Sequence, residues 1–205
     1  MPRQRVALSK DKIIDAAITL VEVGGAEGFS IRKLATAMGV VPMAFYNHFE
    51  DRDALLDAVA EYVLHSLVPL PVKEPWRLRL AALFRGVQNL RVEHPQAFRL
   101  AMSRPTNAAT IANLMGLIIQ SLRDAGLRER EAVTCYHTLV MFLHGFPIWE
   151  AGMISECTPR LPGKRGGDRA VLKRVHSVQP DKQFDASITW LLDSVEALAQ
   201  RERSA

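Results

Sequence analysis

The segment from Gly28 to Phe49 contains basic side chains and no acidic residue. Its cationic or titratable residues are Arg32, Lys33 and His48. An arginine can donate two parallel hydrogen bonds to the O6 and N7 atoms of guanine, and lysine or histidine can bind a phosphate group. The segment is therefore suited to binding a nucleic acid through hydrogen bonds rather than to catalysing a reaction.

Two short helices joined by a turn must position these side chains. Ser30 can cap a helix, because its side-chain oxygen can accept a hydrogen bond from a free backbone N–H group. Four apolar residues then recur at helical spacing: Ile31, Leu34, Ala35 and Met38. Gly39 stands where the chain must leave this helix, and Pro42 suits the first turn of the next one. The pattern predicts a helix-turn-helix, which places its second helix in the major groove of DNA.

The sequence on both sides of this turn extends the pattern. A helix is predicted from Asp11 to Val23, with one apolar face: Ile13, Ile14, Ala17, Leu20 and Val21. After the turn come the aromatic run Phe45-Tyr46-Asn47-His48-Phe49 and the helix start Asp51-Arg52-Asp53-Ala54-Leu55-Leu56. Phe45 and Phe49 recur four residues apart on one helix face, so we predict that both belong to the core.

Residues 9 to 65 resemble the TetR family of one-component repressors in the spacing, the turn glycine, the aromatic run and the following helix. The resemblance implies an all-α protein whose DNA-binding domain spans residues 1–65, with its last helix continuing to about residue 68. It implies that Tyr46 and His48 contact phosphate. It also supports Arg32 as the residue that reads a base, because the family's prototype has a base-contacting arginine at the matching position.

The remaining candidates for DNA contacts are of several kinds. Lys33 is expected to contact phosphate or simply to be solvated. Ser30 and Arg52 lie at helix starts, where free N–H groups favour an anion. The turn and the second helix offer apolar side chains that can touch thymine methyl groups: Val41, Pro42, Met43 and Ala44. Arg3 and Arg5 form either an arm that contacts DNA or a solvated tail, and the sequence leaves both alternatives open.

The composition is that of an ordinary soluble protein. Of the 205 residues, 48% are hydrophobic and 23% are charged. The net charge is +4, but residues 1–65 carry more acids than bases, so overall basicity does not indicate DNA binding. No apolar run approaches the ~18 residues of a membrane span, and no hydrophobic signal region follows the first residues, so we expect a cytoplasmic protein. Cys135 and Cys157 have no metal-ligand spacing and form no disulfide framework.

Residues 69–205 are predicted to form a second all-helical domain after a connector with prolines at 69, 71 and 75. Helices are predicted at about 75–93, 95–103, 107–125, 129–152 and 182–201. The last two carry apolar residues: Val133, Val140, Phe142, Ile148 and Trp149, then Phe184, Ile188, Leu191, Leu192, Val195 and Leu198. The family resemblance implies that these two helices form a homodimer interface, with packing inside one subunit as the alternative. Residues 153–181 are predicted to be a long loop, to which no role is assigned.

The segment from Trp76 to Glu150 resembles the ligand domain of the tetracycline-repressor branch of the family. The resemblance rests on four motifs: His94-Pro95, Arg104-Pro105-Thr106, Asp124-Ala125-Gly126-Leu127 and His144-Gly145-Phe146. The prototype holds its magnesium-bound drug with a histidine four residues before the Arg-Pro-Thr motif, where this chain has Leu100. We therefore expect an apolar or aromatic ligand, with these candidate contacts: Tyr62, His65, Phe84, Phe98, Met102, Met115, Ile119 and His137.

These observations predict a repressor that binds a palindromic operator as a homodimer and releases it when a small molecule binds the second domain. In this mechanism the helix at 52–68 moves like a lever, so that the two recognition helices of the dimer are no longer one DNA turn apart. A transcriptional activator, or a DNA-binding dimer without an inducer, remains the alternative. An enzyme is not expected, and neither is a cofactor or a metal site. The sequence lacks paired carboxylates, a metal-ligand cluster, a glycine-rich phosphate loop and a serine elbow.

Overall fold

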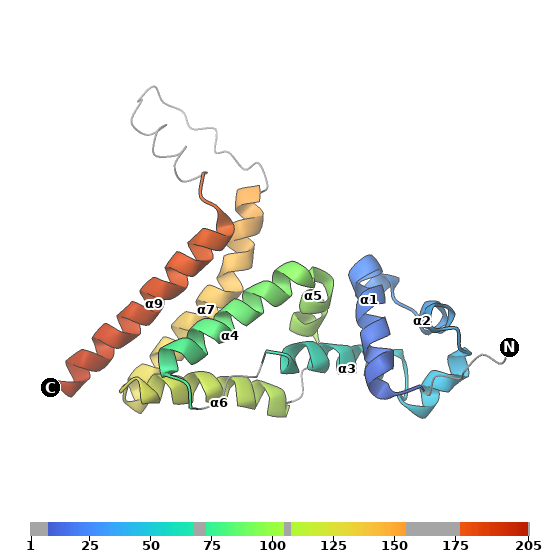
Figure 1. Ribbon diagram of the computed structural model, residues 1–205, viewed down its shortest axis with the longest axis horizontal. Coiled ribbons are helices and arrows are strands. Elements are labelled where there is room, and N and C mark those ends of the chain that lie inside the picture. Colours follow the sequence, from blue (N-terminus) through green and yellow to red (C-terminus); the bar gives the residue numbers. More distant parts are fainter. Residues whose placement is uncertain (1–7, 68–72, 105–107, 155–176, 205) are drawn as a thin grey trace, which may run out of the picture. The chain divides into compact units, whose positions relative to one another are not determined.

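The computed structural model of the chain describes residues 8–67, 73–104, 108–154 and 177–204. All regular structure within these residues is helical (Figure 1), as the all-α prediction requires. The elements in chain order are α1 (Lys10–Gly28), α2 (Ile31–Met38), the 3-10 helix η1 (Pro42–Asn47), α3 (Arg52–His65), α4 (Trp76–Glu93), α5 (Pro95–Ser103), α6 (Ala108–Asp124), α7 (Glu129–Ile154) and α9 (Pro180–Arg203). Arg3, Arg5 and most of the loop predicted at 153–181 lie outside the described residues.

The helix ends agree with the predicted ranges to within about two residues from α4 onward. The first helix is longer than predicted, because α1 continues beyond Val23 to Gly28. Gly25 has a non-helical backbone (φ 63°, ψ 179°) that kinks the helix, and helical residues follow the kink. None of the described helices is long and apolar enough to span a bilayer.

The chain divides into two compact units. The first combines Met1–Pro71 with Arg85–Met115, and the second combines Val72–Phe84 with Gly116–Ala205. Both α4 and α6 therefore contribute residues to each unit. The predicted domain boundary near residue 68 remains a prediction.

The first unit is built on a core shared by α1, α2, η1, α3 and α5. Its buried residues include Ile13, Ala17, Val21, Leu34, Phe45, Leu55, Leu56, Val59 and Leu100. Phe45 is buried and Phe49 packs against the core, so both predictions of core residues are confirmed. Ser9, Ser30 and Asp51 cap α1, α2 and α3, each accepting a hydrogen bond from the backbone N–H three residues later, at 3.4, 3.2 and 2.7 Å.

The short helix α5 packs on α1 and α3 (Figure 1). Charged side chains bind it at both ends. At its start, the carboxylate of Glu22 accepts hydrogen bonds from two backbone N–H groups in the first turn, at 2.7 and 3.3 Å. A carboxylate at this end also complements the helix dipole. Beyond its end, Arg104 donates to the carboxylates of Asp57 and Asp53 on α3, at 2.5 and 2.6 Å. These bonds fix α5 against the helices that support the helix-turn-helix.

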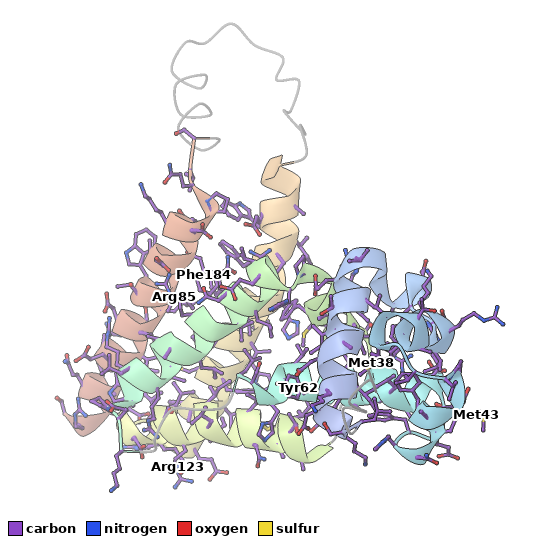
Figure 2. All side chains as sticks on the ribbon, turned by 45° about the vertical axis from the view of Figure 1, so that its right-hand side comes forward. Met38, Met43, Tyr62, Arg85, Arg123 and Phe184 are labelled. Atoms are coloured by element: carbon purple, nitrogen blue, oxygen red, sulfur yellow. The ribbon has the colours of Figure 1, made fainter. Side chains whose placement is uncertain are left out.

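In the second unit, α9 packs on α7 through aromatic side chains. Phe184 of α9, labelled in Figure 2, contacts Phe142 and Phe146 of α7, with ring centroids 5.6 and 5.1 Å apart. Four residues of the predicted apolar face of α9 are buried within the single chain: Phe184, Ile188, Leu192 and Val195. These four residues therefore pack inside one subunit, which was the alternative to a dimer interface.

An ion pair between a buried arginine and an exposed carboxylate joins α4 to the end of α6 in the same unit. The side chain of Arg79 is only 2% exposed, and its Nη2 atom donates to the carboxylate of Asp124. Gln120 also donates to this carboxylate, at 2.8 Å. The hydrogen bonds from Arg79 and then Gln120 hold the pKa of Asp124 below its ordinary value. A buried guanidinium needs such a partner, because an uncompensated buried charge is strongly destabilising.

We expect Asp124→Asn to lower the free energy of unfolding by about 1–3 kcal/mol, because it leaves the buried Arg79 guanidinium without its charged acceptor. The cost is below that of breaking a fully buried pair, because the Asp124 side chain is 39% exposed and solvent screens its charge. Arg79→Met, which removes the buried charge itself, should cost less. The measurement is urea unfolding at pH 7 and one fixed protein concentration. Since the folded-state pKa of Asp124 is lowered, its contribution is present at neutral pH and is lost as the pH falls through the acid range. Asp193→Asn, which alters an exposed pair with Arg77, is the control, and equal losses for Asp124→Asn and Asp193→Asn would contradict the argument.

Candidate nucleic-acid interface

The turn at Gly39 and the helix η1 form an exposed projection of the first unit. Gly39 has a left-handed backbone (φ 66°, ψ 31°), a conformation that glycine adopts at little cost, and it ends α2 as predicted. Val41, Met43 and Tyr46 are 67%, 71% and 48% exposed. Met43 points away from the neighbouring helices (Figure 2). Phe45 points the other way and is buried. The projection thus presents its side chains to solvent while one aromatic ring anchors it.

The second helix of the motif is a 3-10 helix of six residues, Pro42–Asn47. Its backbone bonds span three residues, from Ala44 N–H to the oxygen of Val41 at 3.0 Å and from His48 N–H to that of Phe45 at 2.9 Å. Such a helix is tighter than an α-helix and is used in short pieces. Pro42 is exposed, whereas Ala44 and His48 are half-buried. Of the four apolar candidates, Ala44 is therefore the least accessible to a thymine methyl group.

The start of α2 places its three predicted contact residues differently. Ser30 accepts the capping hydrogen bond from the backbone N–H of Lys33 at 3.2 Å. Arg32 is exposed on the first turn of α2. The Nζ atom of Lys33 donates to the backbone oxygen of Gly28 at 2.6 Å, so this ammonium group already has a partner within the chain. Arg32 is consequently the better placed of the two cations to reach DNA.

Arg52 binds backbone oxygens at the end of α1 and just before α2. It donates from Nη2 to the oxygen of Ala26 at 2.5 Å and from Nε to that of Phe29 at 3.3 Å. Its guanidinium carbon also lies 5.9 Å from the centroid of the Phe29 ring. The sequence predicted a phosphate contact at this position. That contact remains a prediction, and the two backbone bonds tie the start of α3 to the end of α1 and the entry of α2.

Lys10 is a cation near the motif that sequence reasoning missed. Its Nζ atom lies 5.9 Å from the ring centroid of Phe49, the residue after His48. This is a cation–π distance and places an ammonium group beside the aromatic run. No spacing rule links the first residue of α1 to Phe49, so the sequence held no signal for this contact.

The acids at the start of α3 are compensated by Arg104. Its Nη1 atom donates to the backbone oxygen of Asp53 at 3.1 Å, in addition to its bonds to the two carboxylates. The hydrogen bond from Arg104 is the main reason that the pKa of Asp53 lies below its ordinary value. Arg104 is thus a cation bound to these two acids, and its charge reduces their repulsion of an anion such as DNA.

Comparisons with known proteins place this geometry in a family. Residues 13–59 match the family described as bacterial regulatory proteins, tetR family, and residues 68–198 match the tetracyclin repressor-like C-terminal domain. The chain belongs to the TetR family. It is thus a transcriptional regulator that binds DNA through a helix-turn-helix and carries a C-terminal ligand-binding domain of the family's tetracycline-repressor type.

Two curated relatives match this TetR-family protein over nearly their full lengths. The tetracycline repressor protein class A from transposon 1721 of Escherichia coli is 27% identical over 92% of this chain and 90% of its own length. The class G tetracycline repressor of Vibrio anguillarum is 31% identical over 97% of this chain and 96% of its own length. Among solved structures, the regulator SCO7222 of Streptomyces coelicolor has a TM-score of 0.76 at 22% identity, covering 94% of this chain and 100% of its own.

The eight predicted ligand contacts of the TetR-family protein fall into both compact units. Tyr62, His65, Phe98, Met102 and Met115 belong to the first unit, and Phe84, Ile119 and His137 belong to the second. Within the first unit, Tyr62 and His65 line one open cleft. Phe84 is buried. The Nδ1 atom of His137 lies 2.9 Å from the backbone oxygen of Val133 in the previous turn of α7.

Cys135 and the candidate metal ligands can be described for part of the chain. Cys135 is half-buried on α7, and burial raises the pKa of its thiol, which disfavours the reactive thiolate. Cys157 lies outside the described residues. Among residues 8–67, 73–104, 108–154 and 177–204, no group of three or more His, Cys, Asp or Glu side chains is arranged to hold a metal ion.

We expect Arg52→Met to lower the free energy of unfolding by about 1–2 kcal/mol, because it removes charged hydrogen bonds to two backbone oxygens. Arg32→Met, on the exposed face of α2, should change it by less than about 0.5 kcal/mol. Denaturant unfolding of both variants checks this difference. If Arg52 served phosphate binding instead, its replacement would leave stability unchanged and reduce the salt dependence of DNA binding by about one unit.

Proposed function

We propose that the chain is a ligand-responsive repressor that binds a palindromic DNA operator as a homodimer. A small molecule in the C-terminal domain causes release of the operator. The observation that carries the proposal is the exposed projection made by the Gly39 turn and η1, with Arg32 exposed beside it. Its size and exposure suit a DNA groove, and the neighbouring acids of α3 are paired with Arg104.

The proposed reading of DNA combines one base contact with several positioning contacts. Arg32 binds a guanine edge, and Met43 and Val41 contact thymine methyl groups. Tyr46 and His48 contact phosphates and set the register without specifying sequence. With only one strong hydrogen-bonding reader, the operator code is modest and depends partly on DNA shape.

A ligand without a magnesium ion is favoured by the residue that replaces the prototype's histidine. Leu100 is 3% exposed and belongs to the core of the first unit. It offers no ligand atom to a metal. We therefore propose an apolar or aromatic inducer. One solved relative, ActR of Streptomyces coelicolor, has been crystallised with actinorhodin, and its chain is 21% identical to this one.

The proposed dimer uses the apolar residues that α7 and α9 leave exposed. These are Val133, Met141, Ile148 and Trp149 on α7 and Trp190 on α9. Ile148 and Trp190 are 76% and 68% exposed, which is unusual for such large apolar side chains. A two-fold pairing would bury these residues and supply the two recognition helices that paired half-sites require.

The operator is tested by selecting binding sites from a random DNA pool with the full-length protein. We expect a palindrome with half-sites about one helical turn apart. On the selected site, Arg32→Ala should weaken binding by about 1–3 kcal/mol and relax the base preference at one position in each half-site. Arg123→Ala, an exposed arginine of α6 labelled in Figure 2, is the matched control. Failure to enrich any palindrome, or equal effects of the two variants, would overturn the proposal.

The dimer is tested by placing a charge on its proposed face. Ile148→Glu should convert the dimer to a monomer and abolish high-affinity operator binding, because the carboxylate would be buried without a partner. Light scattering after gel filtration measures the mass, and a gel shift measures the binding. Leu78→Glu, on an exposed leucine of α4, should alter neither. A variant at Ile148 that stays dimeric would show that another surface pairs the subunits.

A further inference from the structure

The exposed face of α7 carries two histidines among its apolar residues. Its members follow one another at spacings of three or four positions, as one side of an α-helix requires: Val133, His137, Met141, His144 and Ile148, all of them exposed. The opposite side of the helix is packed within the second unit, with Ala132, Leu139 and Phe146 buried. Both imidazoles therefore lie in the face that the proposed dimer buries.

This face lacks charged side chains. No Asp, Glu, Lys or Arg occurs between Glu131 and Glu150, although these four types make up 23% of the whole chain. A solvated helix face normally carries charged residues, whereas the core of an interface between subunits is depleted of them. The composition therefore favours contact with a second copy of the chain. It also leaves His137 and His144 as the residues of this face that gain a charge when the pH falls below neutral.

The helix packed against α7 also presents an uncharged side. The outward side of α9 runs through residues at the same spacing: Trp190, Ser194 and Ala197. Two exposed acids lie close to them in sequence, Asp193 and Glu196, and both are bound to Arg77 of α4. In a two-fold pairing of these helices, a protonated histidine would therefore meet uncharged residues rather than a free carboxylate.

The surroundings of the two rings within one chain likewise supply no counter-charge. The Nδ1 atom of His137 lies 2.9 Å from the backbone oxygen of Val133. Because a carbonyl oxygen can only accept, Nδ1 carries the proton of the neutral ring and Nε2 takes up the second one. The ring of Tyr136 has its centroid 5.2 Å from that of His137, and a phenol gains no charge on acidification. Among residues 8–67, 73–104, 108–154 and 177–204, neither histidine is paired with a carboxylate.

We propose that protonation of His137 and His144 dissociates the dimer, so that mild acid converts the regulator to monomers. The inference rests on the proposed function, because it needs α7 to pair with a second copy. A neutral imidazole fits such an interface, whereas an imidazolium buried without a carboxylate is costly. The dimer therefore takes up these protons less readily than the monomer. Its stability is complete above the range in which histidine titrates and falls as the pH drops through that range.

The test measures the dimer dissociation constant of the full-length chain, without DNA, between about pH 8 and about pH 5.5. Sedimentation of a fluorescently labelled chain over a dilution series gives the dimer fraction. A histidine that must stay neutral in the dimer weakens it about tenfold for each pH unit below the ordinary value near 6.5. We therefore expect the dissociation constant to rise at least about tenfold at the acidic end. An equal dissociation constant at both ends would overturn the proposal.

Histidine variants assign the response to this face. In the double variant His137→Gln/His144→Gln, both side chains stay polar but take up no proton, so the dissociation constant should change less than about twofold over the same range. His94→Gln, on an exposed histidine that precedes α5 in the first unit, is the matched control and should keep the full response. If the double variant fails to fold, each single variant should still lose part of the response. An undiminished response in all of these variants would contradict the assignment.

The outcomes distinguish this inference from the proposed dimer itself. A chain that is monomeric at the alkaline end, or a dimer that persists in Ile148→Glu, overturns both. A dimer that Ile148→Glu dissociates but that acid leaves intact overturns the role of the histidines alone. Far-ultraviolet circular dichroism checks that the acidic monomer is folded, and loss of helix in parallel with dissociation would overturn the inference, because unfolding would then separate the subunits.

Discussion

A 3-10 helix of six residues cannot hold its own position, because its few backbone bonds have poor geometry and offset little conformational entropy. The placement of η1 therefore depends on the burial of Phe45, which is 1% exposed in a core shared with α1, α2, α3 and α5. One face of η1 is fixed by that ring. The opposite face, with Met43 and Tyr46, is then presented to solvent. Both the shape and the exposure of the candidate DNA surface follow from this single anchoring contact.

Most of the cations around the motif bind groups of the protein itself, and one of them is exposed. Arg52 and Lys33 donate to backbone oxygens at the end of α1 and the entry of α2, and Arg104 binds the acids of α3. Arg32 is left exposed beside η1. A count of basic residues therefore overstates the charge available to phosphate. The sequence could predict that Arg52 starts a helix, but not its backbone partners, because every residue carries a carbonyl oxygen.

The local sequence rules predicted where the helices lie, but not which residues pack against them. The capping serine at 30, the left-handed glycine at 39 and the apolar periodicity of α1 and α2 are short-range features, and the structure contains them. The apolar face of α9 was also correctly recognised as a face. Apolar periodicity predicts that such a face is buried, but it does not identify the residues that cover it. In the structure, Phe142 and Phe146 of the same chain pack against Phe184. The attachment of α5 to the first unit through Glu22 and Arg104 is likewise a long-range result.

One helix joins the DNA surface to the cleft. The first residue of α3, Arg52, binds the entry of α2, and the last turns of α3 carry Glu61 and Tyr62. At 14 residues, α3 is about 21 Å long and stiff on this scale. A molecule bound at one end affects the other only if it favours one position of this helix over another. The same free-energy difference must then appear as a change in ligand affinity when DNA binds, since coupling between two sites is reciprocal. A ligand that binds equally well with and without DNA would occupy the cleft without regulating the motif.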